Sequence, residues 1–134
     1  MKLIDTSVWV DYLRDSETVA TVELDRLLGT DGHLITTTEP IAMELLAGAT
    51  DEVDLARLTK LVDGLPSVPV DPPLDFRAAA AIFRGCRRGG VTVRNLSDCL
   101  IAAVAIRADV ELIHKAADFE TIRRVSPLRA TSWR

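Results

Sequence analysis

The sequence predicts an α/β domain in which helices cover both faces of a central, mostly parallel sheet. Short apolar segments rich in β-branched residues alternate along the chain with longer segments of helical spacing, and 48% of the 134 residues are hydrophobic. Strands that are separated by helices pair in parallel through right-handed crossovers, which places helices on both sides of the sheet. The chain shows no repeat or linker, so a single domain spanning residues 1–134 is expected.

The first half of the chain predicts two strand–helix units and then a second helix that forms a hairpin with the one before it. In each predicted helix, apolar residues recur at helical spacing. Thr6 or Ser7 is expected to cap the first helix, and Asp51 the last one. The predicted elements are a strand at Leu3–Asp5, helices at Val8–Arg14 and Val19–Leu28, a strand at Leu34–Thr37, and helices that end at Gly48 and Gly64.

The second half of the chain continues the alternation. Residues 99–106 are apolar on nearly every side, which indicates a buried helix, and Ser97 or Asp98 is expected to cap it. The predicted elements are an extended piece at Val68–Val70, a helix from Asp75 to Gly89, the buried helix Cys99–Ile106, a strand at Glu111–His114, a helix at Phe119–Val125 and an edge strand at Arg129–Ser132.

The composition argues against several classes of protein. No segment approaches the roughly 18 apolar residues of a membrane span, and the start of the chain lacks a signal-like segment, so a cytoplasmic location is expected. Cys86 and Cys99 are too few for a disulfide framework. With His33 and His114 as the only histidines, neither a Cys/His zinc site nor a Ser-His-Asp triad is favoured.

Four acidic residues stand where the carboxyl ends of parallel strands would bring them together. Asp5 follows the first predicted strand, Glu44 lies in the helix after the second, and Asp98 and Asp118 stand at the starts of later helices. Each has an ordinary alternative, which is helix capping for the aspartates and a solvated helix face for Glu44. As a group they predict a site for Mg²⁺ or Mn²⁺, because hard cations prefer carboxylate oxygens.

A bound cation of this kind supports phosphate chemistry without a histidine base or a cysteine nucleophile, because it activates a water molecule and neutralises charge on the phosphate. Receiver and haloacid-dehalogenase phosphotransfer domains use similar aspartates. The first needs an early acidic pair, and the second needs Asp-x-Asp where Asp5-Thr6-Ser7 stands, so both are disfavoured.

Four linked motifs surround the acidic residues. They are Leu3-Ile4-Asp5-Thr6-Ser7, the segment from Pro40 to Gly48 around Glu44, the segment from Asn95 to Ala103 around Asp98, and His114-Lys115-Ala116-Ala117-Asp118-Phe119. Together they resemble the motifs of PIN-domain ribonucleases, and specifically of the VapC toxins of bacterial type II toxin–antitoxin pairs, and they cover essentially the whole chain in the family's order and spacing.

The resemblance implies a three-layer α/β/α fold and Mg²⁺-dependent cleavage of cellular RNA, often transfer or ribosomal RNA, with Mn²⁺ as the alternative ion. It implies inhibition by a VapB-type antitoxin, in a homodimer or a toxin–antitoxin hetero-oligomer. Asp5, Glu44 and Asp98 fall on the family's acidic metal positions. Thr6 or Ser7 matches the hydroxyl beside the first aspartate, which can hydrogen-bond a carboxylate or a metal-bound water.

One position departs from the family pattern. VapC-like chains usually carry an acidic residue where this chain has Ala116, whereas the second acid of that motif is present as Asp118. Loss of one carboxylate should weaken metal affinity. Two explanations stay open: an inactivating substitution, or a natural variant in which Asp118 takes over. A PIN module that binds RNA or antitoxin with little turnover is therefore the alternative function.

Two surfaces are candidates for binding RNA and a partner. Arg77, Arg84 and Arg88 recur on one helical face with Arg87 and Arg94 near them, and Arg84 and Arg88 are the expected phosphate contacts, although a solvated face is an equal alternative. The apolar residues in excess of a small core resemble the family's antitoxin groove, and ordinary core packing is the alternative for each. They are Val8, Trp9, Tyr12, Leu13, Leu55 and Leu58.

Overall fold

The computed structural model describes residues 1–14 and 16–134, which form a four-stranded sheet with the order β2-β1-β3-β4. All the strand pairs are parallel, with Ile4 of β1 opposite Ile113 of β3. The connection from β1 leads to β2 at one edge of the sheet and the connection from β3 leads to β4 at the other, so the strand order reverses between β1 and β3. The strands are β1 (Lys2–Ile4), β2 (Ile35–Thr36), β3 (Glu111–His114) and β4 (Ala130–Ser132).

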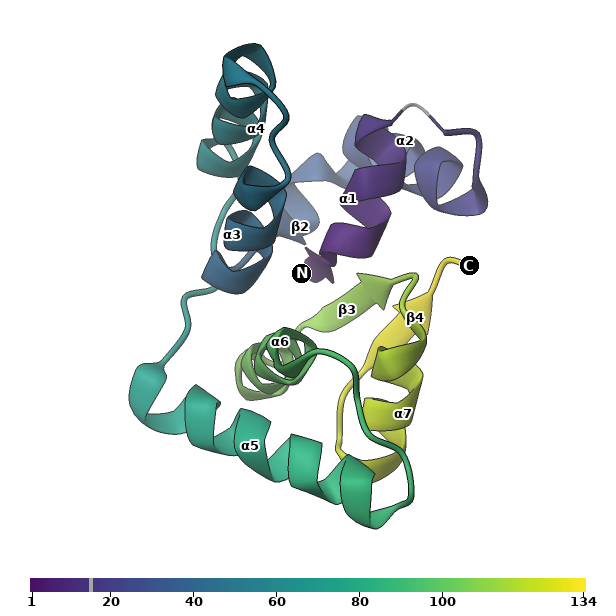
Figure 1. Ribbon diagram of the computed structural model, residues 1–134. Coiled ribbons are helices and arrows are strands. Elements are labelled where there is room, and N and C mark those ends of the chain that lie inside the picture. Colours follow the sequence, from purple (N-terminus) through teal and green to yellow (C-terminus); the bar gives the residue numbers. More distant parts are fainter. Residues whose placement is uncertain (15) are drawn as a thin grey trace.

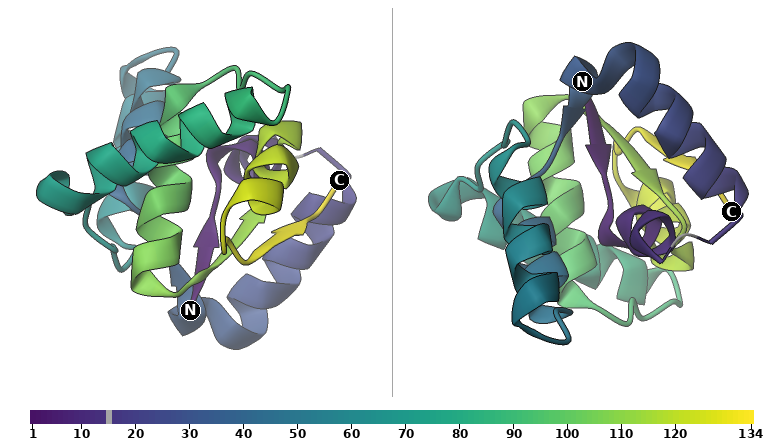
Figure 2. Two further views of the ribbon diagram at one scale, coloured as in Figure 1. Left: turned by 90° about the horizontal axis from the view of Figure 1, so that it is seen from below. Right: turned by 90° about the horizontal axis from the view of Figure 1, so that it is seen from above.

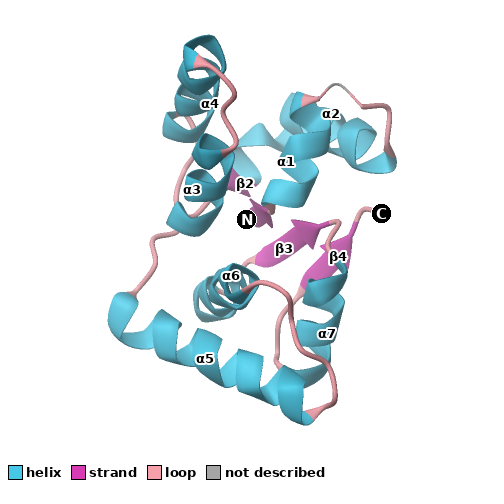
Figure 3. Ribbon diagram, in the orientation of Figure 1, coloured by secondary structure: helices cyan, strands magenta, loops and turns pink. Residues whose placement is uncertain are grey.

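Helices cover both faces of the sheet, which confirms the predicted three-layer α/β/α class (Figures 1 and 3). Helices α1 and α2 lie over one face and α6 and α7 over the other. Helix α5 packs outside α6 and α7, and α3 and α4 form the predicted hairpin (Figure 2). The helices are α1 (Thr6–Leu13), α2 (Val19–Asp31), α3 (Glu39–Ala47), α4 (Glu52–Asp63), α5 (Pro72–Arg88), α6 (Leu96–Ala108) and α7 (Ala117–Val125), with a 3₁₀ turn at Gly32–Leu34.

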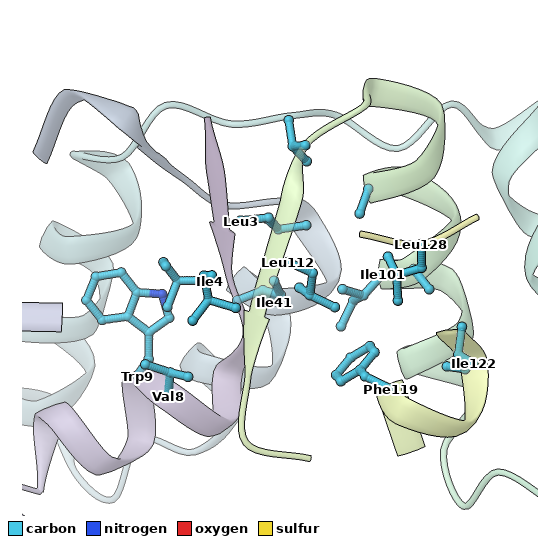
Figure 4. Close-up of a cluster of buried hydrophobic side chains, with 14 of the residues drawn as sticks. Leu3, Ile4, Val8, Trp9, Ile41, Ile101, Leu112, Phe119, Ile122 and Leu128 are labelled. Carbon is cyan, nitrogen blue, oxygen red and sulfur yellow. The ribbon is translucent and has the colours of Figure 1, made fainter. Parts of the chain in front are cut away.

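The core lies on both sides of the two central strands. Leu3 and Leu112 are fully buried, with Trp9 of α1 on one side and Phe119 of α7 on the other (Figure 4). Helix α6 is buried on nearly every side, as its apolar sequence predicts, because it lies between the sheet and α5. Among the described residues, no helix is long and apolar enough to cross a membrane.

Three predicted helix starts lie too late in the sequence, and in two of them an earlier residue makes the cap. Asp5 caps α1, since its side chain accepts a hydrogen bond from the Ser7 N–H. Asn95 caps α6 in the same way, so neither Ser97 nor Asp98 does. Helix α5 begins at Pro72, whose fixed φ suits a first helical turn, whereas the sequence predicted a start at Asp75.

Two boundaries also differ from the prediction. Helix α2 runs through Gly29 and ends at Asp31, because a glycine within a helix costs only about 1 kcal/mol and two further residues continue the turn. The extended piece at Val68–Val70 is not a strand in the described chain. Its neighbour Ser67 makes a single parallel bridge with Thr37.

Candidate functional site

Asp5 follows β1 at the switch point of the sheet, where the connections from β1 and β3 run to opposite edges and open α/β folds bind ligands. It is only 4% exposed. Its Oδ2 accepts hydrogen bonds from the Ser7 N–H at 3.0 Å and from the Ser7 hydroxyl at 2.5 Å. The Ser7 hydroxyl in turn accepts from the N–H of Lys115 at 3.0 Å. Ser7 therefore ties the carboxylate after β1 to the chain that leaves β3.

Glu44 reaches the same region from the middle of α3. Its Oε1 lies 3.3 Å from the hydroxyl of Thr6 and 3.5 Å from that of Ser97, both of which can donate to it. Burial raises the pKa of Glu44, and the nearby charge of Asp5 raises it further, against the lowering effect of the two hydroxyls. The sequence left open whether the helix face that carries Glu44 is solvated or functional. In the structure this face points toward Asp5.

Asp98 lies in the first turn of α6 and interacts with all of the other predicted carboxylates. Burial raises its pKa to about 7, with added contributions from the charges of Asp5, Glu44 and Asp118. Thr6, next to Asp5, and Ser97, next to Asp98, both lie against Glu44, so the fold brings these three acids to one region, and the charge of Asp118 also acts on Asp98. Asp98 does not cap its helix, so the capping alternative does not explain it.

Asp118 lies in the first turn of α7, where its Oδ2 accepts a hydrogen bond from the N–H of Arg94 at 3.0 Å. Ala116 is the N-cap residue of that helix, and no side chain caps it there. The Ala116 side chain is partly buried against the core, and its N–H donates to Nδ1 of His114 at 3.2 Å. The residue that departs from the family pattern therefore lies in the short segment between β3 and α7, two residues before Asp118.

The donor set of this cluster consists of carboxylate and hydroxyl oxygens, which suits a hard cation. His114 is fully buried with Nδ1 accepting a hydrogen bond, and burial lowers its pKa. Burial raises the pKa of the Cys99 thiol to about 11, so it is not a thiolate at neutral pH. In residues 1–14 and 16–134, however, no three Asp, Glu, His or Cys side chains already stand close enough to hold one ion.

Sequence reasoning found the carboxylates but missed a residue that holds one of them. Ser97 was considered only as a cap, yet its hydroxyl lies against Glu44. Its place directly before Asp98 in the third motif is the signal that could have identified it. Thr6 and Ser7 both face carboxylates, as the resemblance implied for the hydroxyl beside the first aspartate.

The apolar residues predicted to lie in excess of the core divide into two groups. Val8 and Trp9 are fully buried and Leu58 is 5% exposed, so core packing explains them. Tyr12, Leu13 and Leu55 are only partly buried. Tyr12 and Leu13 line a cavity of about 540 Å³ with Val22 of α2 and Arg57 of α4.

Arg84 and Arg88 are exposed on the C-terminal half of α5, where no ion pair holds either within the described chain. This end of α5 packs on α7, since a Cβ on Gly85 would lie 3.7 Å from Val125. The loop that follows α5 leads to Arg94, whose N–H binds Asp118. The C-terminal end of α5 and the loop that follows it therefore lie beside α7, the helix that carries Asp118.

Comparison with known proteins agrees with this geometry. A family model described as the PIN domain matches residues 2–125. Ribonuclease VapC11 of Mycobacterium tuberculosis is 52% identical over 134 residues, which is all of both chains. Ribonuclease VapC19 of the same organism is 37% identical over 115 residues, covering 84% of this chain and 86% of the relative.

The fold is also shared with VapBC2 from Rickettsia felis, solved bound to a DNA fragment from its promoter. That chain superposes with a TM-score of 0.77 and 17% identity, covering 99% of this chain and 98% of the other. The PIN-domain match spans nearly the whole chain, and the sequence identity to VapC11 is high over the full length of both chains. The chain belongs to the PIN-domain family and, within it, to the VapC ribonucleases.

Proposed function

We propose that the chain is an endoribonuclease toxin that uses Mg²⁺, or Mn²⁺ in its place, to cleave cellular RNA of the transfer or ribosomal class. The observation that carries the proposal is the convergence of Asp5, Glu44, Asp98 and Asp118 at the switch point of the sheet, because like charges gathered in a half-buried site are costly without a cation. The similarity to ribonuclease VapC11 over the full length supports the reaction class.

Asp5, Glu44, Asp98 and Asp118 would hold the metal. When bound, the ion would supply an activated water and neutralise charge on the scissile phosphate. The chain's own polar groups fix the ligands: Ser7 holds Asp5, and Thr6 and Ser97 hold Glu44. Hydrogen bonds of this kind orient a carboxylate before the metal arrives, which lowers the cost of binding.

The distribution of charge supports an RNA substrate despite a net charge of −4. Between residues 76 and 97 there are five arginines and no Asp or Glu, which leaves 11 of the 16 Lys and Arg residues against 20 acidic residues in the rest of the chain. Cations concentrated on α5 and the loop to Arg94 can bind phosphates close to the cluster. Arg84 and Arg88 are the proposed contacts.

We assign neutralisation to a VapB-type antitoxin, which the solved VapBC2 complex supports. The cavity lined by Tyr12 and Leu13 is continued by another of about 270 Å³ that Leu13, Leu58 and Glu44 line. An amphipathic segment lying across α1, α2 and α4 could therefore bury apolar side chains and still bring a Lys or Arg to Glu44.

Cleavage of a structured RNA by the purified chain tests the activity. Cleavage with Mg²⁺ that stops in EDTA and returns on addition of Mg²⁺ is expected, with the cleaved RNA ends mapped by sequencing. Cleavage that persists in EDTA would contradict the metal role. The alanine at position 116 supports a second candidate function, a PIN module that binds RNA or antitoxin with little turnover. RNA binding without cleavage at saturating Mg²⁺ would favour this second function.

A further inference from the structure

The backbone of Lys115 is tied to the acidic cluster. Its N–H donates to the Ser7 hydroxyl at 3.0 Å, and that hydroxyl donates to Oδ2 of Asp5 at 2.5 Å. Two hydrogen bonds therefore join the Lys115 backbone to one of the carboxylates. A lysine side chain carries its ammonium on a flexible four-carbon stem, so rotation about the bonds of that stem moves the charge widely around a fixed backbone.

The Lys115 ammonium itself is bound to α1. Its Nζ donates to Oδ2 of Asp11, and the side chains of the two residues are 24% and 20% exposed. The same oxygen accepts from the Thr18 hydroxyl at 3.1 Å, which ties the carboxylate to the N-cap of α2. The hydrogen bond from Lys115 lowers the pKa of Asp11 against the effect of burial, so both members of the pair are charged at neutral pH.

We propose that Asp11 is a positioning residue that holds the Lys115 ammonium away from the acidic cluster and so keeps the cluster open for a metal ion. The inference rests on the proposed metal site. Without Asp11, the carboxylates of the cluster would attract the ammonium, because opposite charges interact strongly in a half-buried site. An ammonium among the carboxylates would take the place of the metal. Lys115 would then inhibit its own chain in the way proposed for the Lys or Arg of an antitoxin.

Two other roles fit the contacts of Lys115 less well. A phosphate contact needs a free positive charge, whereas Asp11 already neutralises this ammonium. A role in stability alone would gain little from the pair, because ion pairs that water reaches contribute little to folding. The hydrogen bond from the Lys115 backbone to Ser7 already joins this segment to α1.

Binding of Mn²⁺ to the purified full-length chain, measured by electron paramagnetic resonance without RNA, tests the inference. Asp11→Asn removes the charge that holds Lys115 but keeps an oxygen for the Thr18 hydroxyl. If the ammonium then occupies the cluster in about nine chains of ten, the dissociation constant for Mn²⁺ should rise about tenfold, because only the remaining chains can bind the ion. Asp11→Asn combined with Lys115→Met should restore the parent value, and Lys115→Met alone should leave it unchanged.

Glu111→Gln is the matched control, because Glu111 also accepts from one lysine, Lys2, and from one threonine, Thr131. This pair lies where β1 and β3 begin, whereas the cluster lies where they end. The control variant should lose a comparable ion pair without a change in Mn²⁺ affinity. Circular dichroism of each variant checks that the chain is folded.

Acetylation of the Lys115 amine by acetic anhydride, followed by mass spectrometry, gives a second measurement. In the Asp11→Asn chain, Mn²⁺ should displace the ammonium from the cluster and raise the rate of acetylation at Lys115. In the parent chain the ammonium is already outside the cluster, so Mn²⁺ should leave that rate unchanged.

Three results would overturn the inference. An Mn²⁺ affinity in Asp11→Asn equal to that of the parent, or an equal loss of affinity in Asp11→Asn and in the double variant, would contradict it while the metal site is retained. A raised KM for RNA in Lys115→Met alone would assign the lysine to the substrate instead. A parent chain that binds no Mn²⁺ would contradict the proposed function, and the positioning role with it.

Discussion

Asp5 shows that helix capping, which the sequence set against metal ligation, does not exclude a place in the acidic cluster. Its carboxylate caps α1 through Ser7 and also contributes to the raised pKa of Asp98. One oxygen, Oδ2, accepts both hydrogen bonds from Ser7. An aspartate at this position can therefore stabilise the helix start with Oδ2 while Oδ1 serves the cluster.

Substitution of Asp5 by Asn separates these two roles. An Asn side chain keeps an oxygen for the Ser7 N–H and is an equally good N-cap, but it removes the negative charge. We expect RNA cleavage to fall at least about a hundredfold while the thermal unfolding midpoint hardly changes. Single-turnover cleavage and thermal unfolding measure the two effects. The control is Asp51→Asn, since Asp51 caps α4 by accepting from the Asp54 N–H, and its activity should match that of the parent chain.

Ala116 is the residue whose replacement should increase activity. Ala116→Asp would add a carboxylate next to the cluster, so we expect faster cleavage at limiting Mg²⁺. Because residue 116 is also the N-cap of α7, an aspartate there could act only by stabilising the helix, by about 1 kcal/mol. Ala116→Ser supplies the cap without the charge and is the control. Equal cleavage rates for the parent chain and Ala116→Asp would contradict a metal-binding role for a carboxylate at residue 116. An equal increase in rate from Ala116→Ser and Ala116→Asp would contradict it as well.

At the scale of the elements, an ion pair between a buried aspartate and a partly exposed arginine links α5 to α6. Asp75 is 1% exposed, and both of its oxygens accept from Nε of Arg107 on α6, at 2.9 and 3.1 Å. Arg107 also donates to the carbonyl of Pro69 at 2.7 Å, which fixes the segment before α5. Burial alone would raise the pKa of Asp75, but the hydrogen bonds from Arg107 and from the Asp71 N–H, with the charge of Arg107, outweigh it and lower the pKa.

Asp75→Asn should therefore destabilise the fold by about 2 kcal/mol at pH 7, because it leaves part of a buried pair without its partner. Since the pKa of Asp75 is lowered on folding, the pair stabilises the native state above the unfolded pKa of about 3.9 and is lost as the pH falls below it. Urea unfolding should show a gap between parent and variant at pH 7 that narrows at pH 3. Glu23→Gln, which breaks the exposed pair with Arg26, should have little effect at either pH.

At the scale of the whole molecule, charge is segregated between an acidic body and a basic segment from residue 76 to residue 97. Replacement of Arg84 and Arg88 by Gln should raise KM for RNA about tenfold with kcat nearly unchanged, and should reduce the dependence of log KM on log salt by about 1.4. Lys60→Gln with Arg134→Gln removes the same charge outside the segment and is the control. If both double variants show the same salt dependence of KM as the parent chain, phosphate binding by these arginines is excluded.

Much of the fold could be predicted because its information is local. The strands at Leu3 and Leu112 are short apolar runs, and the glycines after α3 and α4 end those helices as expected. Prediction failed where a boundary depended on a cap that competing residues could equally supply, as at Asp5 and Asn95. It failed again at Asp75, which a sequence pattern assigns to a helix start but which the fold buries against an arginine 32 residues away.

The sequence by itself determined the α/β class, the family and the identity of the four carboxylates, because periodicity and linked motifs depend only on the order of residues. Only the tertiary structure decided that Asp98 interacts with the other three acids, that Ser97 supports Glu44, and that Val8 and Trp9 belong to the core. The ion pair of Asp11 with Lys115 likewise forms only once α1 packs beside β3 and the segment that follows it. Burial and electrostatic interaction depend on distances between segments far apart in the chain, which no local pattern contains.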